Sequence, residues 1–228
     1  MEARQTGVRF TGGALWAFGY ALLFLILFLF VIPGAWGAVP FAIWWTSHLA
    51  LDDGGRAAFT GRAKDVWALF AVLAVLTYLP SLATMGLPKD SGKTQLIQVL
   101  MGLALFPLDA AVKLPVYRWF IENIRLEPGG SARFTGTYGP YLGWAALVAV
   151  SVLSVIGWAW AMTGMMRWFC RHIEAEAFVV EFHGTGLALL WRGFVWVIGM
   201  VFVIPIPWVL RSMFGWWADN LVVVRRMP

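Results

Sequence analysis

Long apolar runs separated by short polar segments are the main pattern of this chain. Residues 14–32, 66–87, 138–166 and 193–210 contain no charged side chain. A helix of about 20 apolar residues spans the core of a bilayer, so each run predicts a membrane helix. Pro or Gly interrupts the pattern and lets a second, shorter helix begin. These breaks are Pro33-Gly34, Gly157 and Pro205-Ile206-Pro207.

One unit of this kind occurs four times. Each copy begins with Phe, any residue and Gly, and it closes with His or Asn 38 residues after the Phe; the second copy needs 64 residues, which is 38 plus an insertion of 26. An aromatic pair stands four residues before each closing residue. Because repeats decide architecture, we divide the single domain 1–228 into units 10–48, 59–123 (with the insertion around 80–106), 134–172 and 182–220, and into pseudo-halves 1–124 and 125–228.

The segments between the units predict β-hairpins. Gly54-Gly55 and Gly129-Gly130 supply the positive φ that a tight turn needs. Residues 173–182 alternate Glu with apolar side chains, as a strand with one exposed face does. We therefore expect an all-α polytopic membrane protein of four tandem two-helix units, about eight membrane helices, with a small cytoplasmic layer of β-hairpins.

The composition also places the chain in a membrane. Hydrophobic residues make up 61% of it and charged residues 13%, whereas about a quarter of a soluble domain is charged. Fifteen Trp are typical of a chain that meets the membrane–water boundary, where Trp collects.

The basic residues predict the orientation. If both helices of each unit cross the bilayer, all hairpins lie on one face, with thirteen Lys and Arg, and the other face holds only Lys89 and Lys93. Cytoplasmic loops are enriched in basic residues, so we expect the hairpins and both termini in the cytoplasm. The net charge of +5 favours anionic lipids of that leaflet as partners, and nothing indicates nucleic acid. The thirteen are Arg4, Arg9, Arg56, Arg62, Lys64, Arg118, Arg125, Arg133, Arg167, Arg171, Arg192, Arg225 and Arg226.

The closing residues and the aromatic pairs have structural interpretations. Because Asn and His share one slot, we expect both to cap the last carbonyls of the second helix; a proton relay or a metal site is the alternative. The aromatic pairs, with the Arg before two of them, predict anchors at the lipid interface. The expected caps are His48, Asn123, His172 and Asn220. The expected anchors are Trp44, Trp45, Arg118, Trp119, Arg167, Trp168, Trp216 and Trp217.

Three charged residues lie inside apolar segments. Asp109 and Lys113 are four apart on one predicted helix and can pair, and Arg211 lies within the last unit. Ionisable groups at membrane depth are expensive and suggest a functional site. The alternative is that their long side chains reach the interface from short helices.

No catalytic or cofactor motif is recognisable. The chain lacks Gly-x-Ser-x-Gly and His-Glu-x-x-His, and residues 86–94 have five residues between two Gly where a phosphate-binding loop needs four. We therefore expect no enzyme, no cofactor and no metal.

The best-marked unit resembles a known family. It runs from Arg133-Phe-Thr-Gly through Trp158-Ala-Trp-Ala and Arg167-Trp-Phe-Cys-Arg-His172 to Glu181-Phe-His-Gly-Thr-Gly186. These residues resemble the YjgN-like bacterial inner-membrane proteins, whose function is uncharacterised. The resemblance implies a multi-pass protein of the bacterial inner membrane, and it implies no functional residues.

Two functions follow as hypotheses. One is passage of a small solute or ion through the helical bundle, past Asp109, Lys113 and Arg211. The other is a scaffold or accessory subunit of a membrane complex, which docks other subunits through its Trp-rich helix flanks and its β-layer.

Overall fold

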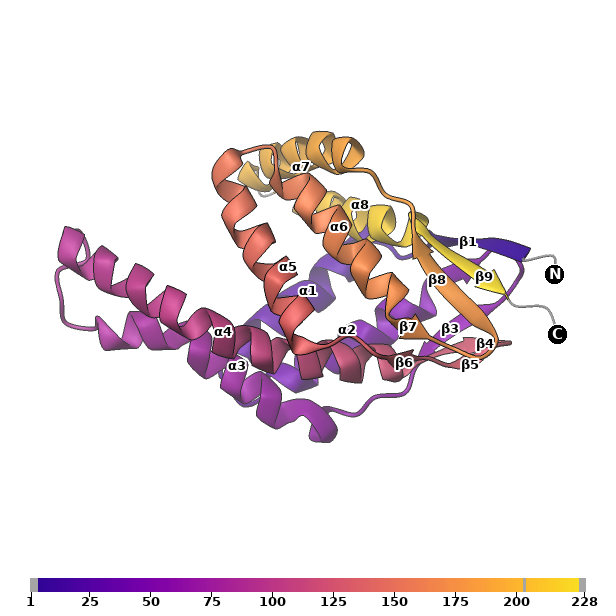
Figure 1. Cartoon of the computed structure of the whole chain (residues 1–228), viewed down its shortest axis with the longest axis horizontal. Helices are drawn as coiled ribbons and strands as arrows, with labels where there is room; N and C mark the ends of the chain where they lie inside the picture. Colours follow the sequence, from indigo (N-terminus) through magenta and orange to yellow (C-terminus); the bar gives the residue numbers. More distant parts are fainter. Residues whose placement is uncertain (1–3, 203, 226–228) are drawn as a thin grey trace.

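The computed structural model describes residues 4–202 and 204–225, which form helices and short strands in alternation (Figure 1). Arg226, one of the basic residues used to predict the orientation, lies outside the described residues. The helices are α1 (Ala14–Leu29), α2 (Gly34–Ser47), α3 (Ala63–Ala83), α4 (Gly92–Glu122), α5 (Tyr138–Ser151), the 3₁₀ turn η1 (Val152–Ser154), α6 (Trp158–Arg171), α7 (Gly186–Val201) and α8 (Ile206–Asp219). The strands are β1 (Arg4–Phe10), β2 (Leu49–Leu51), β3 (Arg56–Phe59), β4 (Ile124–Glu127), β5 (Gly130–Ser131), β6 (Arg133–Phe134), β7 (Ile173–Glu174), β8 (Phe178–Phe182) and β9 (Leu221–Arg225).

The nine strands form one antiparallel sheet that nearly closes into a ring. Their order is β5-β4-β3-β2-β1-β9-β8-β7-β6, so the two edge strands are consecutive in sequence and only Ala132 lies between them. The first and last strands pair directly, with Gln5 opposite Val224. The pairing of β1 with β9 therefore joins the two halves of the sheet.

Side chains fill the interior of this ring. Residues from β1, β2, β3, β4, β8 and β9 belong to a single buried cluster. Strand residues alternate in direction, and those of the cluster are short or medium-sized, except for Phe10 and Phe178. Opposite walls of the ring therefore meet in a packed core. Its strand members are Val8, Phe10, Leu49, Leu51, Ala57, Leu126, Phe178 and Val223.

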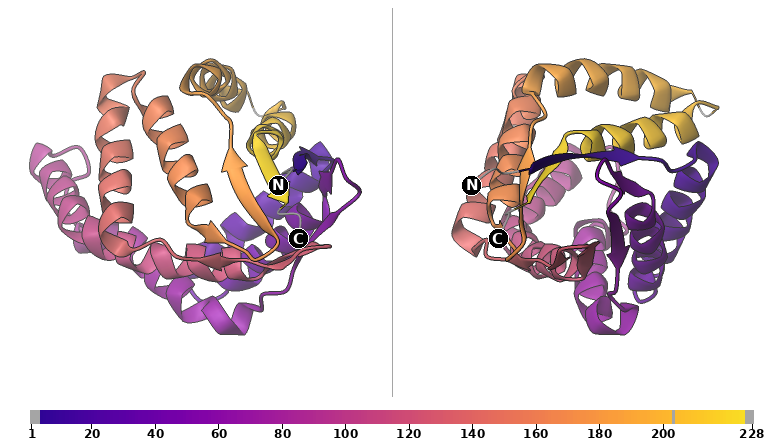
Figure 2. Two further views of the ribbon diagram at one scale, coloured as in Figure 1. Left: turned by 45° about the vertical axis from the view of Figure 1, so that its right-hand side comes forward. Right: turned by 90° about the vertical axis from the view of Figure 1, so that its right-hand side faces the viewer.

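The helices form four consecutive pairs. They extend away from the sheet, which lies at one end of the molecule, and are arranged around it when viewed from that end (Figure 2). Each helix contacts its neighbours in sequence, and α8 contacts α1, so the helices also form a closed ring. The breaks within the pairs lie at residues 30–33, 155–157 and 202–205, close to where Pro and Gly predicted them. The α3–α4 pair differs from the others because it extends far beyond their turns (Figure 1).

The prediction of an all-α protein with about eight membrane helices is wrong. Within the described residues, only α3 and α4, with 21 and 31 residues, are long and apolar enough to cross a membrane. The other helices are too short because the Pro and Gly breaks divide the apolar runs into helices of only 14 to 16 residues. The sheet was underestimated because several of its strands have two to four residues, and only their pairing around the ring identifies them.

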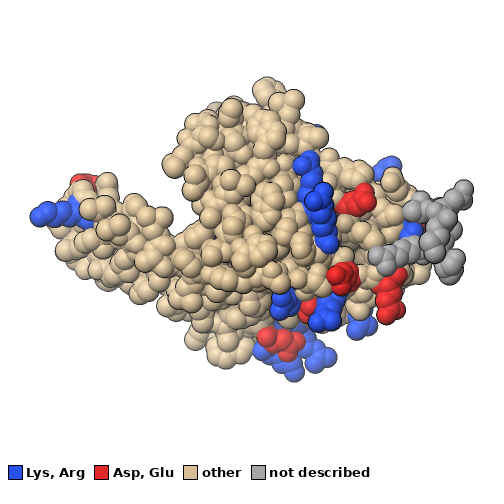
Figure 3. All heavy atoms as spheres, viewed as in Figure 1, with Lys and Arg blue, Asp and Glu red and all other residues tan. Residues whose placement is uncertain are grey.

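Charge is distributed unevenly over the surface. On the face shown in Figure 3, Lys, Arg, Asp and Glu gather over the strands and the adjoining helix ends, and again at the far tip of the α3–α4 pair. The surface between these two regions carries no charge in that view. Many large apolar side chains of the helices are exposed, among them Leu100 and Leu103 of α4 and Leu147 of α5, at 56%, 67% and 50%.

Candidate functional site

The same backbone contact closes each unit where the helices meet the ring. The residue after each starting Phe donates its N–H to the carbonyl of the closing His or Asn, and all four bonds measure 2.9 Å. Three of these residues are Thr, and their hydroxyls donate to the same carbonyl at 3.0 to 3.2 Å. The fourth, His183, contacts Glu181 instead, at 3.0 Å. The four pairs are Thr11–His48, Thr60–Asn123, Thr135–His172 and His183–Asn220.

Phe, Gly and Trp pack together at each of these points. The Phe ring meets the first aromatic residue of the pair edge to face, with centroids 5.3 to 6.0 Å apart, a favourable arrangement for aromatic rings. The Gly has no room for a side chain; a Cβ on Gly61 would lie 2.7 Å from both Phe59 and Trp119. Trp44 and Trp216, two of the expected lipid anchors, are only 6% and 5% exposed. The structure therefore places them in the core.

The remaining expected anchors lie in the same region. Trp45, Trp119, Trp168 and Trp217 are half-buried. Trp45 contacts Phe120, and Trp217 contacts Phe182. The exposed Trp residues fall into two sets. Trp16, Trp67 and Trp191 lie in the first two turns of α1, α3 and α7, at 67%, 44% and 69%. Trp36, Trp160 and Trp208 lie in the first turns of α2, α6 and α8, at 46%, 50% and 57%.

The four expected caps bind the carbonyl four residues before them. The amide nitrogens of Asn123 and Asn220 donate to Trp119 and Trp216 at 2.8 and 2.7 Å. Nδ1 of His48 and of His172 lies 2.8 and 2.7 Å from the Trp44 and Trp168 carbonyls, so this nitrogen carries the proton. Asn and His thus make the same bond at the ends of α2, α4, α6 and α8.

Three Arg side chains connect consecutive units. Each donates from the second helix of one unit to the Gly carbonyl at the start of the next, and the bond from Arg211 joins the last unit to the first. At the fourth joint, Ile43 occupies the position that corresponds to Arg118 and Arg167. The three bonds are Arg118 Nη2 to Gly136 at 3.1 Å, Arg167 Nη2 to Gly184 at 2.7 Å and Arg211 Nε to Gly12 at 2.9 Å.

Asp109 and Lys113 form an ion pair, with Nζ and Oδ2 2.6 Å apart. Their side chains are 24% and 44% exposed and line a cavity of about 200 Å³ between α4, α5 and α6. Aromatic side chains, including Tyr117 and Tyr141, complete its wall. Arg211 is not among the lining residues, so the structure does not bring the three predicted intramembrane charges together at one site.

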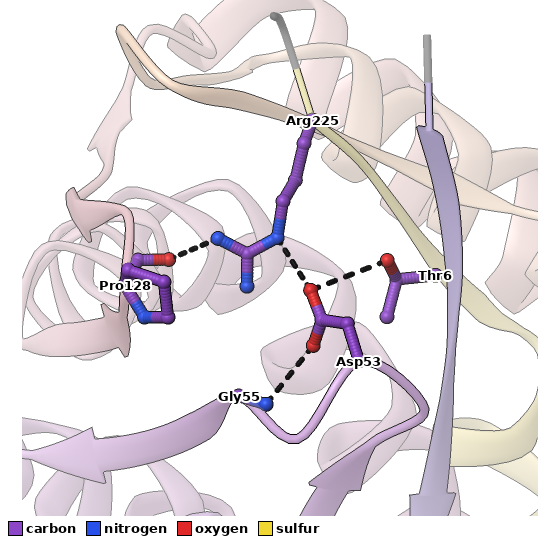
Figure 4. Close-up of polar contacts among 5 residues, drawn as sticks. All are labelled: Thr6, Asp53, Gly55, Pro128 and Arg225. Atoms are coloured by element: carbon purple, nitrogen blue, oxygen red, sulfur yellow. Dashed lines mark hydrogen bonds and ion pairs between the residues drawn. The ribbon is translucent and has the colours of Figure 1, made fainter.

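A polar cluster at the rim of the ring was not predicted (Figure 4). Arg225 Nε of β9 donates to Asp53 Oδ2 at 2.6 Å, and Arg225 also donates to the carbonyl of Pro128. The Gly55 N–H and the Thr6 hydroxyl donate to the same carboxylate, at 3.0 and 3.4 Å. The side chains of Arg225 and Asp53 are only 19% and 10% exposed.

These contacts set the pKa of Asp53. Burial acts to raise the pKa of this carboxyl, but the hydrogen bond from Gly55 and the Arg225 guanidinium outweigh burial and hold the pKa below its usual value. No local sequence signal marks the cluster, because Asp53 resembles an ordinary turn residue and its partner lies 172 positions away.

The site chemistry is therefore that of packing and hydrogen bonding. Within residues 4–202 and 204–225, no three His, Cys, Asp or Glu side chains gather as a metal site would require. No family model, curated protein or solved structure matches the chain. The resemblance to the YjgN-like proteins stays a prediction.

Proposed function

We propose that this chain is a non-enzymatic membrane scaffold. In this proposal the α3–α4 pair crosses the bilayer and anchors the protein. The ring of strands lies at the cytoplasmic surface, where it binds another subunit of a membrane complex. Both ends of the chain then lie on the cytoplasmic side, because β1 and β9 pair within the ring.

The packed interior of the ring carries this proposal. A solute that moved along the axis of the molecule would have to pass the buried side chains that fill the ring, which come from β1–β4 on one side of the sheet and from β8 and β9 on the other. Protein interiors are packed as closely as organic crystals. A nearly closed, filled ring held by pairing between β1 and β9 is suited to present a fixed surface.

The surface of the ring supports a binding role. Exposed basic side chains alternate with exposed acidic ones over the strands and their turns, which suits a polar partner surface. Trp16, Trp67 and Trp191 are exposed near the ring ends of their helices, where rings of Trp contact lipid headgroups. The exposed basic residues there are Arg9, Arg56, Arg62, Lys64, Arg125, Arg133 and Arg171.

Site-specific photo-crosslinking in intact membranes tests this proposal. A crosslinker at Arg125 or Glu176, both exposed on the ring, is expected to give a discrete adduct with one partner subunit. The matched control is Leu100, exposed on α4, which is expected to give only lipid adducts. Ring positions that yield no protein adduct, together with a purified chain that conducts solutes in liposomes, would refute the scaffold.

Passage of a small solute or ion is a second candidate, and one observation favours it. The Asp109–Lys113 pair lines a cavity between apolar helices, where ionisable groups usually have a function. Flux through proteoliposomes is then expected to disappear in the double variant Asp109→Asn/Lys113→Met, which leaves no unpaired charge. Unchanged flux in this variant would exclude the cavity as the route.

A further inference from the structure

The turns of the helix pairs fall into two kinds. The connection from α3 to α4 carries Lys89 and Asp90, with Lys93 in the first turn of α4. The turns of the three short pairs contain no charged residue. Their apolar side chains are nevertheless among the most exposed in the molecule: Phe30 at 69%, Leu153 at 84% and Ile204 at 84%.

The short pairs are also too short to cross a bilayer. Their longest helices, α1 and α7, have 16 residues, or about 24 Å at 1.5 Å per residue, against a hydrocarbon core of about 30 Å. They are inclined to the α3–α4 pair as well, as α5 and α6 show clearly in Figure 1. Their reach along the α3–α4 direction is therefore smaller than their length.

In the α1–α2 and α5–α6 turns, the N–H groups at the bend find acceptors within the chain. Phe30, Val31 and Ile32 donate their N–H groups to Leu27, Phe28 and Phe30. In the α5–α6 turn, Val155 and Ile156 donate to Val152 and Ser154. Lipid cannot satisfy a backbone donor, so a turn within the hydrocarbon must satisfy its own.

The α1–α2 and α5–α6 turns each have a Val with positive φ at the bend. Val31 and Val155 have φ of 67° and 63°, which is a genuine outlier for a β-branched side chain. Gly occupies this region in the other turns, including Gly54 at 81° and Gly86 at 95°. Gly or Asn is the usual choice in a turn that faces water. Gly would avoid this backbone strain. A Val at this position is favourable where contacts between its apolar side chain and the surroundings stabilise the turn by more than the strain costs.

We propose that α1–α2, α5–α6 and α7–α8 are re-entrant pairs whose turns are covered by lipid acyl chains. They enter the bilayer from the ring side, turn within the hydrocarbon and return, and only α3–α4 crosses. This inference rests on the membrane location in the proposed function. The protein then occupies more area in the leaflet next to the ring than in the opposite leaflet, which only α3 and α4 enter. A short signature marks each such turn: Val-Ile followed by Pro or Gly, 21 residues after the starting Phe, at Val31, Val155 and Val203.

Single-cysteine labelling of the full chain in sealed proteoliposomes tests the inference, in a Cys170→Ala background. The positions are Leu153→Cys and Phe30→Cys in the turns, Lys89→Cys at the α3–α4 tip and Glu176→Cys on the ring. A membrane-impermeant maleimide is expected to label Lys89→Cys from one side only and Glu176→Cys from the other. It is expected to label Leu153→Cys and Phe30→Cys from neither side, although both react fully after solubilisation in SDS.

A bimane label separates burial in lipid from burial in protein. When it is attached in detergent before reconstitution, the label on Leu153→Cys is expected to be quenched by doxyl groups on acyl chains and not by aqueous iodide. Labelling of Leu153→Cys from the same side as Lys89→Cys would mean that the short pairs cross, and labelling from the ring side would mean that they lie on the surface; either result overturns the inference. If Lys89→Cys and Glu176→Cys react from the same side, the membrane location itself fails.

Discussion

The two ends of each helix pair differ. The base is the end that meets the ring of strands, and the tip is the turn between the two helices. At the bases, the same hydrogen bond, the same Phe–Trp contact and the same crowded Gly occur four times. At the tips, one pair is long and ends in charges, and three are short and end in apolar side chains. Contacts within the chain decide the bases, because each base must fit its neighbours in a closed ring. The surrounding medium decides which residue types the tips carry, because the tips make few contacts with the rest of the chain.

A charge at a tip is expected to have the largest effect. Leu153→Lys places an ammonium where we propose acyl chains, and a Lys at membrane depth costs about 3 kcal/mol. Ser91→Lys at the α3–α4 tip is the control and is expected to cost only about 0.5 kcal/mol, from repulsion by Lys89 and Lys93 and from its place at the N-terminus of α4. The measurement is the yield of folded, membrane-inserted protein. Equal yields for the two variants would remove the distinction between the tips.

A methyl group at a base is expected to cost somewhat less. Gly61→Ala would bring a Cβ to within 2.7 Å of Phe59 and Trp119, and overpacking of this kind costs about 2 kcal/mol. Gly139→Ala has no atom within 4 Å of the new Cβ and is the matched control, expected within about 0.5 kcal/mol of the parent. The free energy of unfolding in mixed micelles checks this. A stable Gly61→Ala protein would show that the base can relax.

Acid is expected to weaken the ring and leave the tips unaffected. The pKa of Asp53 in the folded protein lies below its usual value of 3.8. A lowered folded pKa contributes stability that is complete above the unfolded pKa and is lost as the pH falls through the folded one. Asp53→Asn is expected to cost about 1.5 kcal/mol at neutral pH.

The pH dependence provides the check on this cluster. The difference in unfolding free energy between the parent and Asp53→Asn should be constant above about pH 5 and shrink as the pH falls below 3.8. A difference that does not change with pH would show that the Asp53 carboxylate charge has no part in the stability of the rim.

The smallest effect is expected at the joints between units. Arg167→Met removes the hydrogen bond to Gly184 and is expected to cost about 1 kcal/mol. Arg171→Met, which removes an exposed charge one turn further along α6, is the control and should be nearly neutral. Unfolding free energies in micelles test both variants. A larger loss for Arg171→Met would place the important contact with lipid headgroups instead.

Sequence reasoning succeeded where the signal is local. The Pro and Gly breaks, the caps four residues after their carbonyls and the i,i+4 spacing of Asp109 and Lys113 all lie within one or two helical turns. It failed where partners are distant in sequence. Arg211 binds Gly12 across 199 positions, and Asp53 binds Arg225 across 172. Sequence reasoning also overestimated the number of membrane-spanning helices. An apolar run is long as a whole, but the break within it leaves helices that are too short to span a bilayer.

The sequence by itself determined the apolar segments, their breaks, the spacing of the Phe-x-Gly starts and the place of the charges, since each depends on residue type and short-range geometry. Only the tertiary structure decided that the short strands join into a ring, that the first and last strands pair, and that three helix pairs end well short of the fourth. Closing a ring is a long-range event: strands of two to four residues have too few side chains to specify a partner, and their pairing follows from the helices and joints that bring them together.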